Sequence, residues 1–142
     1  MPEYTLRPAW PGADGQMIDQ LFADPEAVKN PLATGPVSAA MLDGQRTFLV
    51  GLEDGREVAA IDLVTLEGLA WIGMAVLLGH RQRGVGTGIL KAFVEEARAK
   101  GLRHLMTRFE EGNLGARQAF LNAGFHVESQ TDGLIELELS LE

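Results

Sequence analysis

The stretch from Arg81 to Thr87 places two arginines, two glycines and a threonine at the point where a helix is expected to begin. The first turn of a helix leaves main-chain N–H groups without partners and carries the positive end of the helix dipole, so it attracts anions. Arg83 adds charge to that of Arg81, and Gly84 and Gly86 let a ligand approach the main chain closely. The spacing therefore predicts a phosphate site.

Two well-known phosphate motifs do not fit this stretch. The dinucleotide fingerprint needs a glycine where Ile89 stands. Gly79 and Gly84 have the spacing of the two glycines in the nucleoside triphosphate loop GxxxxGK[ST]. That motif then needs a lysine and a hydroxyl residue where Val85 and Gly86 stand. A turn whose glycines only shape the main chain and whose arginines are solvated stays open as the alternative.

Composition limits the class of protein. The chain has 142 residues, no cysteine and a formal net charge of −8, which excludes a thiol nucleophile and disfavours non-specific nucleic-acid binding. We expect a single domain over residues 1–142 in the cytoplasm, because no signal peptide and no membrane-spanning stretch is evident. His104 and His126 share no metal-ligand spacing, so no metal site is expected.

Hydrophobic periodicity and turn residues predict the elements that position this turn. Asp54 and Gly55 give a strong hairpin signal between two strands, and Gly101 is suited to end the central helix. The predicted order is β-α-α-β-β-β-α-β-α-β-β, an α/β fold. The strands are expected at 4–10, 46–52, 56–66, 69–77, 103–109, 125–131 and 134–142, and the helices at 14–24, 37–42, 84–100 and 113–123.

Two motifs in the expected order resemble the GNAT superfamily of acyl-CoA-dependent N-acetyltransferases. Residues 81–86 match its R/Q-x-x-G-x-G/A signature after an apolar strand. Downstream, five residues have the spacing of its pattern N-x-x-A-x-x-x-Y-x-x-x-G-F: Asn113, Ala116, Phe120, Gly124 and Phe125. The likeness covers essentially the whole chain and implies a mixed, mostly antiparallel central sheet flanked by helices, with a splayed central strand pair.

The resemblance also implies how acetyl-CoA is bound. The pyrophosphate would be held by the turn and the first helical residues: Arg81, Gln82, Arg83, Gly84, Val85, Gly86 and Thr87. The main chain of Met74, Ala75 and Val76 would pair with the pantetheine arm, and an N–H near Val76 would stabilise the thioester oxygen. Asn113 and Phe120 are expected near the cofactor, although Asn113 is equally well suited to cap a helix.

The proton-transfer groups are less clear. Phe120 stands where many members have a tyrosine, so it cannot protonate the leaving thiolate. Glu111 and Asp62 are the predicted general bases, and Glu110 and Glu67 are further candidates. For the three glutamates a solvated surface position is the favoured alternative. Asp62 interrupts an apolar strand, and an outward-facing position for it is the favoured alternative.

The resulting functional prediction is transfer of an acetyl group from acetyl-CoA to a primary amine of a small molecule or peptide, by direct attack in a ternary complex. Nucleic-acid and membrane partners are not expected, and a homodimer is possible within the superfamily. A non-catalytic acyl-CoA-binding sensor or interaction module is the alternative, and a domain with a vacant groove is a third.

Overall fold

The computed structural model describes residues 2–32, 46–77 and 84–142. The short helix predicted at 37–42 and the predicted pyrophosphate contacts Arg81, Gln82 and Arg83 lie outside these ranges. Among the described residues the predicted order of strands and helices is confirmed. The elements are β1 (Tyr4–Pro8), α1 (Pro11–Phe22), β2 (Thr47–Glu53), β3 (Arg56–Leu66), β4 (Leu69–Val76), α3 (Val85–Ala99), β5 (His104–Glu110), α4 (Leu114–Asn122), β6 (His126–Thr131) and β7 (Leu134–Ser140).

One mixed sheet of seven strands runs in the order β1-β2-β3-β4-β5-β7-β6. Neighbouring strands are antiparallel except β4 and β5, which are parallel, so the mostly antiparallel sheet predicted from the sequence is confirmed. The turn at Asp54 and Gly55 has positive φ at both residues, 50° and 84°, as a tight hairpin turn requires.

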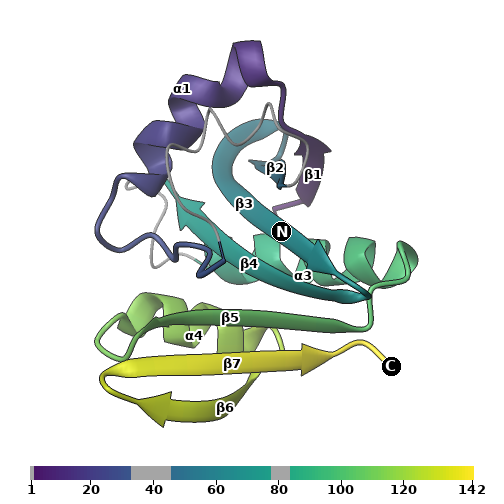
Figure 1. The fold of residues 1–142 in the computed structure, drawn as a ribbon. Coiled ribbons are helices and arrows are strands. Elements are labelled where there is room, and N and C mark those ends of the chain that lie inside the picture. The colour runs from purple at the N-terminus through teal and green to yellow at the C-terminus, as the bar shows by residue number, and fades with distance from the viewer. Residues whose placement is uncertain (1, 33–45, 78–83) are drawn as a thin grey trace.

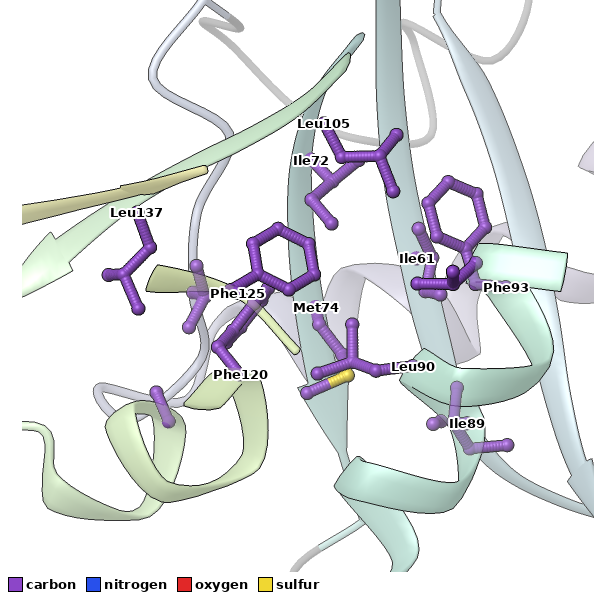
Figure 2. Close-up of a cluster of buried hydrophobic side chains, with 14 of the residues drawn as sticks. Ile61, Ile72, Met74, Ile89, Leu90, Phe93, Leu105, Phe120, Phe125 and Leu137 are labelled. Atoms are coloured by element: carbon purple, nitrogen blue, oxygen red, sulfur yellow. The ribbon is translucent and has the colours of Figure 1, made fainter. Parts of the chain in front are cut away.

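Helices lie on both faces of the sheet (Figure 1). α1 packs on one face through Ile18, Leu21 and Phe22, whereas α3 and α4 pack on the other. The larger core lies under α3 and α4, where Phe93 and Phe120 meet strand residues such as Ile72 (Figure 2). Within the described ranges, no helix has the length and apolar character needed to cross a membrane.

An ion pair fastens the start of α1 to β1. α1 begins at Pro11, three residues before the predicted start, because proline suits the first turn of a helix. Arg7 donates to both carboxylate oxygens of Asp14, at 2.7 and 3.0 Å, and the Trp10 N–H donates to Asp14 Oδ2 at 2.7 Å. These bonds hold the pKa of Asp14 below its ordinary value, with the bond from Arg7 as the largest cause.

Replacing Asp14 with asparagine is expected to lower the free energy of unfolding by about 2 kcal/mol at neutral pH, because a buried charge-assisted pair is lost. The lowered pKa means that this stability is present above the ordinary value of 3.8 and disappears as the pH falls through the folded value. Urea unfolding of both proteins from neutral pH down to about pH 3 should therefore show converging stabilities. Glu95→Gln, in an exposed pair with Arg98, is the control and should cost less than about 1 kcal/mol.

Candidate active site

The parallel strands β4 and β5 separate soon after they begin. They pair only at Leu69–His104, Ala70–Leu105 and Trp71–Met106, and Figure 1 shows them diverging beyond this point. The Thr107 hydroxyl then donates to the Ile72 carbonyl at 3.0 Å, which is a side-chain link in place of the next main-chain bond. The splayed strand pair implied by the sequence resemblance is therefore present.

A cleft of about 920 Å³ lies at this separation, within the size range of small-molecule sites. Its walls come from the second half of β4, the start of α3, the end of β5, α4 and the segment 25–29. Six of the predicted cofactor contacts line the cleft: Met74, Val76, Gly84, Gly86, Thr87 and Asn113.

The start of α3 opens into the cleft without a side-chain cap within the described ranges. Its N-cap, Gly84, adopts a left-handed conformation with φ of 82°, which glycine tolerates best. The first-turn N–H groups of Val85, Gly86 and Thr87 have no carbonyl one turn earlier to bond within the helix. With the helix dipole, they form a positive end that suits an anion.

The edge of β4 that faces the cleft is partly paired. Val28 and Met74 exchange two main-chain hydrogen bonds, each of 2.8 Å. The Leu77 N–H bonds to Val58 of β3, so by alternation the main chain of Ala75 faces β3 and that of Val76 faces the cleft edge. Of the three predicted pantetheine partners, Met74 thus already pairs with the chain itself, and Ala75 faces away.

Asn113 has the capping role that the sequence left open. Its side-chain oxygen accepts from the Ala116 N–H at 3.2 Å at the start of α4, and its amide donates to the Glu26 carbonyl at 2.8 Å. Asn113 therefore connects the start of α4 to the segment 25–29. Asn113 itself also lines the cleft.

Phe120 lies in the hydrophobic core and is completely buried. Its ring makes an edge-on contact with Phe125 at 5.0 Å and a tilted one with Phe109 at 5.7 Å. This packing corrects its place among the predicted cofactor contacts, because a side chain without exposed surface cannot touch a ligand. Val85 is likewise buried, which leaves only its main chain for a ligand.

Asp62 lies outside the cleft, and the expectation that it faces outward is wrong. Its side chain is only 2% exposed. Arg46 binds both of its oxygens, with Nε at 3.1 Å from Oδ1 and Nη2 against Oδ2. Burial nevertheless raises the pKa of Asp62, although the hydrogen bond and charge of Arg46 oppose this shift. Asp62 shares its face of the sheet with the core under α1, whereas the cleft adjoins the core under α3 and α4.

The two glutamates at the end of β5 differ in position. Glu110 lines the cleft. Glu111, which the sequence favoured, is exposed, does not line the cleft and accepts a hydrogen bond from Gln130 at 3.0 Å. Arg108 lines the same end of the cleft, bonds Glu136 at 2.9 Å and lies 5.4 Å from the centre of the Trp71 ring.

Two residues that shape the site were not found from the sequence, Val28 and Asn30. The Asn30 amide donates to the Trp71 carbonyl at 2.7 Å and to the Asp62 carbonyl at 3.3 Å, and its oxygen accepts from the Leu32 N–H. The Asn30-Pro31 dipeptide signals a turn, but it carries no information about which strands the turn will contact.

Gly73 lies where the segment 28–30 runs closely beside β4, and the space there admits no side chain. A Cβ at this position would lie 2.5 Å from the Val28 carbonyl oxygen and 2.8 Å from the Asn30 nitrogen, both main-chain atoms. Gly73→Ala is therefore expected to displace the segment and to lower the free energy of unfolding by about 2 kcal/mol, as overpacked sites do. Urea unfolding provides the measurement.

Gly12→Ala is the matched control for this change, since a Cβ on Gly12 meets nothing within 4 Å. Its stability should change by less than about 1 kcal/mol, and in the favourable direction. If the two variants had the same free energy of unfolding, the segment 28–30 could move away from residue 73 without loss of stability, which would contradict the prediction.

Comparison with solved structures shows which class of protein this fold defines. The chain is similar to yncA from Salmonella typhimurium, whose structure holds its cofactor acetyl-CoA, with 20% identity, a TM-score of 0.74 and coverage of 98% of this chain and 94% of that one. It is similar to AAC(6')-Ib in complex with parmomycin and acetyl-CoA, with 17% identity, a TM-score of 0.75 and coverage of 97% and 93%. A ribosomal-protein alanine N-acetyltransferase from Escherichia coli gives 16% identity, a TM-score of 0.73 and coverage of 97% and 94%.

These likenesses establish the fold as that of acetyltransferases. The family model described as "Acetyltransferase (GNAT) family" matches residues 15–125, and the chain belongs to this family. No curated protein matches the chain significantly.

Proposed function

We propose that this protein transfers an acetyl group from acetyl-CoA to a primary amine. The observation that carries the proposal is the uncapped start of α3, which opens into the cleft between the separated strands β4 and β5. Family membership and the acetyl-CoA held by two similar structures support the same reading. One of the similar structures holds parmomycin, and a third belongs to a ribosomal-protein alanine N-acetyltransferase; antibiotics of this kind and proteins both offer amines.

The residues present fit the phosphate end of this donor. The N–H groups of Val85, Gly86 and Thr87 would hold the diphosphate, and the absence of a side chain at Gly86 keeps the approach open. The main chain of Val76 faces the cleft edge and would stabilise the negative charge that develops on the thioester oxygen.

In the proposed reaction the amine nitrogen attacks the thioester carbon, the carbon–sulfur bond breaks, and the thiolate leaves while the amine loses one proton. Direct attack is favoured because the chain has no cysteine to carry an acyl group. Glu110 lines the cleft and would accept the proton of the amine. Phe120 has no proton to give and is buried, and a thiolate is a stable enough leaving group to depart unprotonated.

The test is acceptor-dependent release of free thiol from acetyl-CoA, with polyamines, amino acids, aminoglycosides and peptides as acceptors. Because the protein has no cysteine, a thiol reagent reports only the coenzyme product. We expect release above the blank with at least one class of amine, and Glu110→Gln should lower kcat by at least about tenfold.

Buried Phe120 favours one other function, a module that binds acyl-CoA without catalysis. Its signature would be saturable binding of acetyl-CoA by calorimetry together with thiol release no faster than the blank for every amine. That result would contradict acetyl transfer and keep the donor site.

A further inference from the structure

A cluster of two histidines and two glutamates lies across the last three strands of the sheet. His104 comes from β5, Glu138 from β7, and His126 and Glu128 from β6. No helix of the described residues covers this face of the three strands, since α4 lies on the opposite side (Figure 1). None of the four residues lines the cleft, so the proposed acetyl transfer leaves them without a role.

The strand register brings these side chains together. His126 is the cross-strand partner of Glu138, and the register shifts between Val127 and Ser129. This irregularity leaves Glu128 as an extra residue beside the pair, as a β-bulge does. The spacing along the chain did not predict a metal site, because the contacts run across strands and depend on register and bulge.

Three of the four side chains, those of His126, Glu128 and Glu138, are close enough to share one ion, and His104 touches this group through Glu138. His126 Nε2 lies 2.9 Å from Glu128 Oε1, and His104 Nδ1 lies 3.2 Å from Glu138 Oε1. The potential ligand atoms of His126, Glu128 and Glu138 all lie within 4.8 Å of one another. Zinc ligands in a tetrahedron stand about 3.5 Å apart, so the atoms of these three residues are spaced closely enough to approach one ion together.

The charges of the cluster call for a cation. Two adjacent carboxylates repel each other unless a positive charge lies between them. His104 Nδ1 is buried, and its 3.2 Å contact with Glu138 Oε1 lacks hydrogen-bond geometry.

We propose that His126, Glu128 and Glu138 bind one divalent transition-metal ion, with His104 beside Glu138. Imidazole nitrogen and carboxylate oxygen are the ligands that zinc accepts, so zinc is the ion to test. An ion held there would join β7 to the edge strand β6, and would stabilise the folded protein by binding it in preference to the unfolded chain.

Calorimetry with zinc chloride on the chelator-treated full chain tests this proposal. We expect one ion per chain with a Kd of about 10 µM or lower, and a melting temperature that rises with zinc. His126→Gln and Glu138→Gln should each weaken binding by at least about tenfold and remove the thermal shift. The partly exposed side chains make both variants suitable, and circular dichroism verifies their fold.

Glu136→Gln is the matched control, because Glu136 lies on the same strand but pairs with Arg108. It should bind zinc with unchanged affinity. Binding that does not saturate would overturn the proposal, since zinc would then associate non-specifically. Equal affinity in the wild type and in both cluster variants would also overturn it, since the ion would then bind elsewhere on the protein. Neither result depends on whether the protein transfers acetyl groups.

Discussion

Replacing Gly86 with glutamate should reduce the affinity for coenzyme A by at least about 100-fold, or about 2.7 kcal/mol. The carboxylate would lie in the first turn of α3, at the end of the helix that we assign to the diphosphate. Like charges at this point oppose ligand binding, whereas the same carboxylate favours the helix itself through the dipole. The variant should therefore lose the ligand while its thermal stability is kept or raised, which separates a binding defect from misfolding.

Two further substitutions at Gly86 separate the contribution of side-chain size from that of side-chain charge to the loss of coenzyme A affinity. A Cβ would meet Met74 Cε and Ala119 Cβ at 3.4 Å, so Gly86→Ala should bind coenzyme A nearly as the wild type does. Gly86→Gln has the size of glutamate without its charge and should fall between the two. Isothermal titration calorimetry of all three provides the measurement, and unchanged affinity in the glutamate variant would refute the placement of the diphosphate.

The ion pair of Arg46 and Asp62 carries the other large expected effect. Arg46→Met alone should lower the free energy of unfolding by about 3–5 kcal/mol at neutral pH, because it leaves a buried carboxylate without its partner. Burial already raises the pKa of Asp62 against the opposing influence of Arg46, so without Arg46 the pKa rises further. The folded variant then takes up a proton more readily than the unfolded chain, and its stability falls as the pH rises from the ordinary value of 3.8 toward the raised one.

The double variant Arg46→Met with Asp62→Leu should recover most of this loss, since apolar residues of similar volume replace a buried ion pair with little cost. Urea unfolding of the wild type, both single variants and the double variant gives the coupling energy directly. As a control, Lys100→Met removes the exposed pair with Glu96 and should cost less than about 1 kcal/mol. A loss that is independent of pH, or a double variant as unstable as the sum of the singles, would contradict this account.

Local patterns in the sequence were sufficient for most of the fold. The hairpin at Asp54 and Gly55 is encoded by two adjacent residues, and the inward stripe of α3 by the spacing of its apolar side chains. The motif around Gly84 and Gly86 located the start of the helix that opens into the cleft. Each of these features depends only on residues that are close together in the sequence. They can therefore be predicted without knowing the tertiary structure.

The errors at the site have a common physical origin in contacts between distant segments. The burial of Asp62 depends on α1, which covers its face of β3, and on Arg46, which pairs with it from just before β2. Phe120 matches its motif by spacing alone, and spacing does not distinguish a ring in the core from one in a cleft.

The pairing of Val28 with Met74 limits how an extended donor can be held. An arm lying along β4 would compete with Val28 for the main chain of Met74, and it would find the main chain of Ala75 turned toward β3. Main-chain pairing of the arm with this part of β4 would then be restricted. Affinity for the donor would consequently be concentrated in its nucleotide and diphosphate portion, so truncated thioesters without that portion would be poor substrates whatever acyl group they carry.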